Sequence, residues 1–147
     1  LRGVEVCLET GIKVGDCMKT ILVSIKDDAS VFDAARKLKE KNVGSVLVTS
    51  VKTGKIYGIV TERDIVRKCV AVKKMNVSVK RIASKPLIGI APEADLSDAA
   101  KLMRNEGIKR LVVFNASKIV GIISSSDIVR VSPSLYDLLS ERQLARR

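Results

Sequence analysis

The sequence predicts an α+β fold in which two tandem βαββα repeats pack sheet to sheet with pseudo-two-fold symmetry. One observation is a duplicated Asp-Ala-Ala triplet, found at 33–35 and again at 98–100. A second is the stretch "GIVTERD", from residue 58, which returns as "GIISSSD" from residue 121. Third, in each copy a segment with helical spacing of apolar residues is flanked by short runs rich in β-branched residues, which predict strands. A unit of ~60 residues buries little apolar surface alone, so the two copies are expected to share a core.

The first repeat is expected to open with a buried strand over residues 21–25, an apolar run that leads into a helix. Ser30 is the expected N-cap of that helix, and Asp33 lies where a negative charge complements the helix dipole. Asn42 or Gly44 is expected to end it. The positions expected to face the core have i, i+3, i+4, i+7 spacing: Val31, Ala34, Ala35 and Leu38.

A hairpin and a second helix are expected to complete this repeat. Residues 46–48 and 56–60 are rich in β-formers and flank Thr53-Gly54, which predicts two antiparallel strands joined by a turn. The helix after them is expected to bury one side, made of Ile65, Val66, Cys69 and Val72.

The second repeat follows the same order, with Asp95 as the expected helix cap and Gly107 as its stop. Its expected apolar face is Leu96, Ala99, Ala100 and Met103. We therefore divide the chain into an N-terminal extension, a first repeat, a connector, a second repeat and a C-terminal helical tail. Their predicted bounds are 1–13, 14–72, 73–80, 81–131 and 132–147.

Composition narrows the possible functions. The 147 residues contain no histidine, which removes histidine-activated nucleophiles and the commonest metal ligand, so we expect neither an enzyme nor a metal site. Cys7, Cys17 and Cys69 have no C-x-x-C spacing and are interpreted as free thiols. No apolar run is long enough to span a bilayer, and the first residues lack the core of a secretory signal, so a cytoplasmic location without a membrane contact is expected.

A net charge of +11 favours an anionic partner. Nucleic acid is one such partner, through a basic surface. However, Phe32, Tyr57, Phe114 and Tyr136 are the only aromatic residues, too few for a base-stacking platform.

The hydroxyl of each repeated stretch, Thr61 or Ser124, falls where a strand ends and a helix begins. Free N–H groups at such an end favour an anion, so these residues are candidate phosphate ligands. Arg63 adds a cation in the first copy, whereas Ser126 takes its place in the second. The two sites are therefore expected to bind unequally.

The Asp and Gly of each stretch suit the rest of a nucleotide. Asp64 and Asp127 carry carboxylates that accept two hydrogen bonds at once, which fits the paired hydroxyls of a ribose. Gly58 and Gly121 allow a flat ring or another backbone to approach closely. The alternative interpretation is that the hydroxyl and the acid form a plain helix cap.

Residues 14–130 resemble a tandem pair of cystathionine β-synthase (CBS) domains, also called a Bateman module, of the stand-alone prokaryotic or archaeal type. The lead-ins "VGDCMKT" and "VKRIASKP" and both Asp-Ala-Ala helices share in the resemblance. It implies an adenosine-containing ligand (AMP, ADP or ATP, with S-adenosylmethionine or a dinucleotide as alternatives) in clefts between paired repeats, and no required cofactor. It assigns ribose to the two Asp residues, and phosphate or ribose to Thr61 and Ser124.

The resemblance also implies a base pocket at the entry to the first strand and the start of the second strand of each repeat. The corresponding residues are Thr20, Ile21, Val43 and Gly44 in one copy and Lys85, Pro86, Leu87 and Ile108 in the other. Lys109 and Arg110 stand where the first copy has Gly44 and Ser45, and are candidate phosphate ligands or else a solvated strand start.

The expected function is that of a non-catalytic regulatory module, a homodimer that signals energy or metabolite state to a regulated protein. The alternative is a basic nucleic-acid-binding or structural dimerisation protein with vestigial pockets.

Overall fold

The computed structural model describes residues 9–145, with the side chains of residues 9–140. It contains two compact units. The first unit is Ile21–Leu87, and the second unit joins Leu1–Thr20 to Ile88–Arg147. Each unit therefore contains one βαββα repeat, but the lead-in to the first repeat belongs to the second unit. Both units mix helices with a three-stranded sheet, as the predicted fold class requires.

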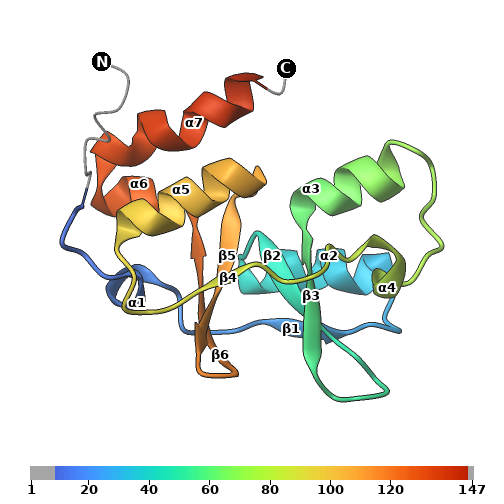
Figure 1. Ribbon diagram of the computed structural model, residues 1–147. Coiled ribbons are helices and arrows are strands. Elements are labelled where there is room, and N and C mark those ends of the chain that lie inside the picture. Colours follow the sequence, from blue (N-terminus) through green and yellow to red (C-terminus); the bar gives the residue numbers. More distant parts are fainter. Residues whose placement is uncertain (1–8, 146–147) are drawn as a thin grey trace. The chain divides into compact units, whose positions relative to one another are not determined.

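In the first unit, the sheet has the order β1–β2–β3, made of Ser24–Lys26, Ser45–Thr49 and Ile56–Thr61. β1 runs parallel to β2, and β2 pairs antiparallel with β3. The helix α2 (Val31–Lys41) joins β1 to β2, and α3 (Glu62–Ile65) continues as a π-helical stretch, Val66–Val70. α4 (Val79–Ile82) follows (Figure 1).

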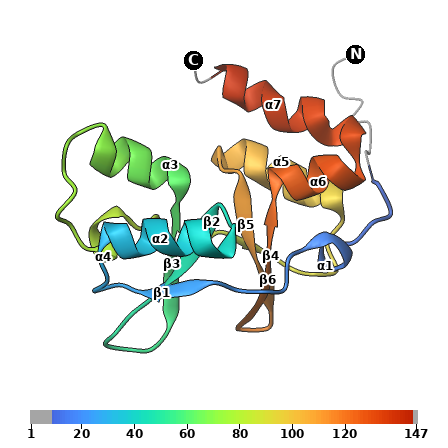
Figure 2. The ribbon, with the colours of Figure 1, turned by 180° about the vertical axis from the view of Figure 1, so that it is seen from behind.

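The second unit repeats this order. β4 (Gly89–Ile90), β5 (Arg110–Asn115) and β6 (Lys118–Ser124) form its sheet, with α5 (Leu96–Glu106) between the first two strands. α6 (Ser125–Val131) and a 3₁₀ turn (Pro133–Leu135) lead to α7 (Tyr136–Ala145). α1 (Val14–Cys17) also belongs to this unit. α7 packs along α5, as both views show (Figures 1 and 2).

The duplication extends to the strand register. Val48 pairs with Gly58 beside a bulge in β2, and Val113 pairs with Gly121 beside a bulge in β5. A bulge at a fixed place in a repeat bends the strand in the same way in each copy. The glycine of each repeated stretch thus occupies the same place in its sheet.

Local signals in the sequence correctly located both long helices. Ser30 caps α2, which ends at Asn42 in a left-handed conformation, and Asp95 caps α5, which ends at Gly107. Leu96, Ala99, Ala100 and Met103 are all buried, as are Val31, Ala34 and Leu38, whereas Ala35 is half-buried.

Two predictions of detail were wrong. The expected strand over residues 21–25 begins only at Ser24, and the side chain of Ile21 is 86% exposed. In the second helix, Ile65 and Cys69 are buried but Val66 and Val72 are exposed. Val66 lines the groove beside α2, and Val72 follows a π-helical stretch whose i→i+5 hydrogen bonds shift later residues away from the face that the i, i+4 pattern assumes.

Each unit has its own apolar core. The core of the first unit includes Val79 and Ile82 of α4, from the lead-in to the second repeat. The core of the second unit includes Val14, from the lead-in to the first repeat. Among the described residues, no helix is both long and apolar enough to cross a membrane.

Candidate functional site

The hydroxyl and the acid of each repeated stretch form a reciprocal helix cap. Thr61 is the N-cap of α3, and its Oγ1 accepts a hydrogen bond from the N–H of Asp64 at 3.2 Å. The Oδ2 atom of Asp64 accepts the N–H of Thr61 in return, at 2.9 Å. Ser124 and Asp127 repeat this arrangement at α6, with distances of 3.1 and 3.0 Å. One oxygen of each carboxylate therefore does what the capping interpretation expects.

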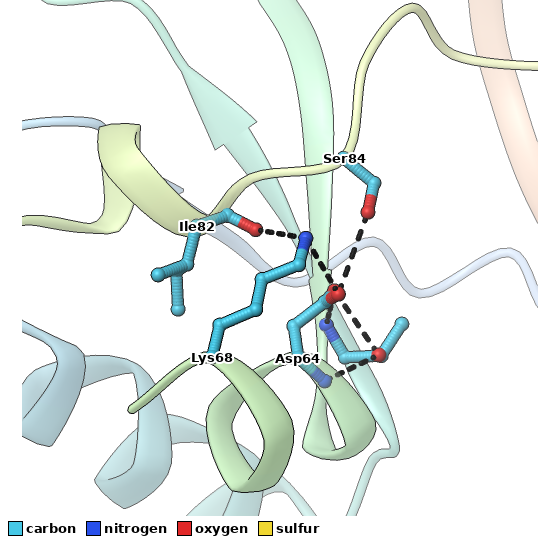
Figure 3. A network of polar contacts seen from close by, with 5 residues as sticks. Asp64, Lys68, Ile82 and Ser84 are labelled. Atoms are coloured by element: carbon cyan, nitrogen blue, oxygen red, sulfur yellow. Dashed lines mark hydrogen bonds and ion pairs between the residues drawn. The ribbon is translucent and has the colours of Figure 1, made fainter. Parts of the chain in front are cut away.

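The other oxygen of Asp64, Oδ1, faces side chains rather than its own backbone. Lys68 Nζ lies 3.0 Å from this atom, and Ser84 Oγ lies 3.5 Å from it. The same ammonium group also donates to the carbonyl oxygen of Ile82, at 3.0 Å. Figure 3 shows Lys68 extending from its helix between Ile82 and Asp64, with Ser84 on the connector beyond. The side chain of Asp64 is 12% exposed, so the carboxylate lies at the edge of solvent.

The second copy holds Asp127 by looser ion pairs. Its Oδ1 lies 3.6 Å from the Nη1 of Arg130 and 3.8 Å from the Nζ of Lys19. These distances exceed those of a good charged hydrogen bond, and both cations are largely exposed. The carboxylate itself is more deeply buried than that of Asp64. Both sites thus pair one carboxylate oxygen with a cation, but with different geometry.

Ser84 and Lys19 reach these carboxylates because the lead-in of the opposite repeat pairs with the glycine-bearing strand. Ser84 exchanges two backbone hydrogen bonds with Ile59, and Lys19 does the same with Ile122. Lys19 and Ser84 are 65 residues apart, which is the offset of the duplication.

The repeated glycines make room for these lead-ins. A Cβ at Gly58 would lie 3.2 Å from the carbonyl oxygen of Ser84. A Cβ at Gly121 would lie 2.9 Å from the carbonyl oxygen of Lys19 and 2.5 Å from the Sδ of Met18. Here the group that approaches each glycine is another backbone segment.

The predicted residues at the start of the second strands line two hollows. Val43 and Gly44 line a groove of about 570 Å³ between α2 and α3, together with Asn42 and Glu62. Lys109 lines a cavity of about 460 Å³ in the second unit. Its other lining residues are Ser125, Ser126, Val129, Arg130, Tyr136, Leu139 and Ser140. The second hollow is the more basic and hydroxyl-rich of the two.

The remaining predicted residues lie at the surface or close to it. Arg63, Thr20, Lys85 and Pro86 are exposed, and Arg110, Leu87 and Ile108 are half-buried. The Lys85–Pro86 peptide bond is cis. Ile21 presents an almost fully exposed apolar side chain. Over the described residues, no group of three histidine, cysteine or acidic side chains could hold a metal ion.

Two thiols were correctly expected to be free. Cys17 is half-buried and Cys69 is fully buried, with no disulfide. Burial raises the pKa of both thiols, and a nearby carboxylate raises it further, from Asp16 for Cys17 and from Asp64 for Cys69. Both are therefore poor nucleophiles at neutral pH. Cys7 lies outside the described residues.

Sequence reasoning missed the cations that contact the two carboxylates. Lys68 stands four residues after Asp64 and Arg130 three residues after Asp127, so helical spacing could have identified both. Lys19 and Ser84 are far away in the sequence. Only the internal alignment of the two lead-ins could have pointed to them.

Comparison with known proteins gives the family context. The family model of the CBS domain matches the chain twice, over residues 14–71 and 79–134. Protein MJ0653 of Methanocaldococcus jannaschii is 39% identical over 132 residues, which are 88% of this chain and 67% of that protein. The CBS domain-containing protein YhcV of Bacillus subtilis is 30% identical over 78% of this chain and 81% of its own length.

Several solved structures have a fold similar to that of this chain. A conserved protein of Pyrococcus horikoshii has a TM-score of 0.76 at 29% identity and covers 82% of this chain and 91% of its own. The hexameric CBS-CP12 protein of bloom-forming cyanobacteria has a TM-score of 0.74 at 33% identity, over 80% of this chain and 66% of its own. The CBS domain protein PAE2072 of Pyrobaculum aerophilum, complexed with AMP, shares the fold, with a TM-score of 0.73 at 24% identity over 88% and 99%.

Proposed function

The chain belongs to the CBS-domain family, with two CBS domains in tandem, and on this basis we propose that it binds an adenosine-containing nucleotide at Asp64 and Asp127. CBS domain proteins are generally regulatory modules rather than enzymes. In the proposed function, a nucleotide such as AMP, ADP or ATP reports energy or metabolite state, and the protein transmits it to a regulated partner without catalysis.

The observation that carries the proposal is the divided role of each carboxylate. Oδ2 of Asp64 completes the helix cap, while Oδ1 meets only flexible side chains, Lys68 and Ser84. A flexible side chain can yield its place to a ligand hydroxyl, whereas a backbone N–H in a helix cap cannot do so without unfolding the first turn. Asp127 has the same division. In each site, a carboxylate oxygen beside a cation suits a ribose that carries phosphate.

Surrounding residues support a nucleotide. The exposed side chain of Ile21 offers an apolar surface at a position where the family commonly places the base. Lys109 and Arg130 add positive charge around one hollow. AMP is bound in the PAE2072 structure, but because identity there is only 24%, the likeness is one of fold, and the chemistry of the carboxylates must carry the proposal.

Thermal unfolding with and without AMP tests this function in the unmodified protein, Asp64→Ala and Asp127→Ala. A nucleotide at 100 times its dissociation constant stabilises the folded state by about 2.7 kcal/mol. We expect that stabilisation in the unmodified protein and its loss or reduction in at least one variant. Unchanged stabilisation in both variants would contradict the ribose assignment.

Because each substitution also removes a cap, the experiment needs a matched control. Asp33→Ala removes the carboxylate of an equivalent cap, formed with Ser30 in α2, on a side chain that is not proposed to bind nucleotide. It removes one capping hydrogen bond and is expected to lower stability by about 0.5–1.5 kcal/mol, yet to keep the full stabilisation by AMP. Loss of the AMP effect in this control would point to general destabilisation.

We also propose a homodimer. In the second unit, α7 covers part of α5, and Leu139 is buried there. The corresponding groove of the first unit leaves Val66 56% exposed. A second copy is the occupant that would bury this apolar surface, and the CBS-CP12 relative is an oligomer. Sedimentation should give a dimer for the unmodified protein and a monomer for Val66→Asp.

The second candidate is nucleic-acid binding, which the net charge of +11 favours. It predicts an affinity for RNA or DNA that falls steeply with salt, because bound phosphates release counterions. AMP binding in a site with hydrogen bonds to ribose depends on salt far less. A salt titration with both ligands therefore separates the two functions.

A further inference from the structure

Lys68 contacts the oxygen of the Asp64 carboxylate that takes no part in the helix cap. Its Nζ lies 3.0 Å from Asp64 Oδ1 and donates to the carbonyl of Ile82 at the same distance. Oδ2 is committed to both the N–H and the hydroxyl of Thr61. Oδ1 already accepts the lysine ammonium at 3.0 Å and contacts the Ser84 hydroxyl at 3.5 Å, so a ligand hydroxyl that binds Asp64 competes with the ammonium group for this oxygen (Figure 3).

We infer that Lys68 makes the Asp64 site selective for phosphorylated adenosine over the uncharged nucleoside, because a ligand that binds Asp64 displaces its ammonium group. This inference rests on the proposed function and names a specificity-determining residue for it.

The selectivity follows from what the displaced ammonium group loses. Lys68 has two partners in the free protein, a carboxylate and a carbonyl, and its flexible four-carbon stem lets it move to a new one. An uncharged nucleoside offers no anion, so the whole ion pair is lost on binding. A phosphate group of the ligand supplies a new negative partner and offsets that loss.

Displacement also frees the carbonyl of Ile82, the last residue of α4. Ile82 is buried in the core of the first unit, and the connector continues from it to Ser84, which also contacts Asp64 Oδ1. Ligand binding is therefore coupled to the connector through one side chain, which gives the site a route to the rest of the chain.

The second copy has no lysine at the position equivalent to Lys68. The residue equivalent to Lys68 is Val131, which carries no charge. Lys19 and Arg130 approach Asp127 at 3.8 and 3.6 Å, and within the described part of the chain neither side chain donates to a backbone carbonyl as Lys68 does to Ile82. The selectivity is thus assigned to the Asp64 site alone.

Calorimetric titration with adenosine and with AMP tests the inference, in an Asp127→Asn background so that one site is measured. For Lys68→Met, the adenosine dissociation constant is expected to fall about two- to five-fold, the effect of removing a partly exposed ion pair. The ratio of the adenosine constant to the AMP constant is expected to fall by at least the same factor. Lys68→Arg keeps the charge and should keep the ratio within about two-fold. Lys74→Met, the same change at an exposed lysine of the connector, should leave it unaltered.

The results for Lys68→Met and for the unmodified protein distinguish failure of the inference from failure of the proposed function. If Lys68→Met leaves the ratio of the adenosine and AMP dissociation constants unchanged, or binds adenosine more weakly, the inference is overturned. The proposed function still stands in that case, provided that AMP binding depends on Asp64. Absence of AMP binding in the unmodified protein overturns both. If Lys68→Met does not fold, Lys68→Ala provides a second uncharged variant with the same expected ratio.

Amide hydrogen exchange tests the proposed coupling between Lys68 and the connector. Amide hydrogen exchange over residues 79–84 should become faster in Lys68→Met without ligand and in the unmodified protein with AMP, since both remove the bond to the Ile82 carbonyl. Unaltered exchange in both cases would contradict the coupling to the connector.

Discussion

Asp95 ties the segment before α1 to the start of α5, and replacing it with Asn is predicted to weaken the second unit in a pH-dependent way. Oδ1 of Asp95 accepts hydrogen bonds from the N–H and hydroxyl of Thr10, at 3.0 and 2.9 Å, and from the N–H of Ser97 at 2.9 Å. Oδ2 accepts the N–H of Gly11 at 2.8 Å. An amide keeps one acceptor oxygen but replaces the other with a donor, which opposes one of these N–H groups.

The magnitude follows from the pKa of this carboxyl group. Burial raises the pKa of Asp95, but the hydrogen bonds from Ser97 and Thr10 outweigh it and lower the pKa from 3.8 to about 2. A difference of this size corresponds to about 2 kcal/mol, and partial exposure to solvent reduces it to on the order of 1–2 kcal/mol. Because the folded-state pKa is the lower one, this stability is fully present above pH ~4 and is lost as the pH falls toward 2.

Urea unfolding of the unmodified protein and Asp95→Asn, at pH 6 and at pH 2.5, measures the effect. The two proteins should differ by at least about 1 kcal/mol in unfolding free energy at pH 6, and the difference should shrink at pH 2.5. Asp28→Asn, at an exposed carboxylate, is the control and should change stability by less than about 0.5 kcal/mol. A difference for Asp95→Asn that is equal at both pH values would refute the reasoning.

Two further comparisons test the packing of the lead-ins and of the first unit. Gly121→Ala should lower the melting temperature more than Gly58→Ala, because its added Cβ meets a backbone oxygen at 2.9 Å and the other meets one at 3.2 Å; equal effects would contradict the close approach. Tyr57→Phe should lower the unfolding free energy by about 1 kcal/mol, because the buried carboxylate of Asp27 loses the tyrosine hydroxyl at 2.9 Å. The matched change Tyr136→Phe, at an exposed ring, should have little effect in the same denaturation assay.

Much of the fold could be predicted because its signals are local. The caps at Ser30 and Asp95 and the left-handed stops at Asn42 and Gly107 are encoded within a few residues of each helix end. The duplication then doubled the evidence for each element. Because of the duplication, Gly58 and Gly121 also have the same strand register, each beside a bulge of the neighbouring strand.

The parts that could not be predicted depend on distant segments or on irregular geometry. Nothing in the spacing of the apolar residues reveals the π-helical stretch that precedes the exposed Val72. The exchange of lead-ins, which carries Val14 into the second unit and Val79 into the first, is set by tertiary packing.

The candidate site shows both cases. The cap formed by Thr61 and Asp64 follows from a local motif, and the contact of Lys68 with Asp64 follows from their i, i+4 spacing on one helix. Ser84 and Lys19 reach the two carboxylates only through the exchanged lead-ins.

The measurement that bears most directly on the proposed function compares AMP with 2′,3′-dideoxy-AMP by calorimetry, in the unmodified protein and in the Asp64→Ala, Asp127→Ala double variant. A hydrogen bond to a charged group contributes about 1.5–3 kcal/mol, so loss of the ribose hydroxyls should weaken binding at least about ten-fold in the unmodified protein. The double variant should bind both nucleotides weakly and without preference. Equal affinity of the unmodified protein for the two nucleotides would contradict the assignment of these carboxylates to ribose.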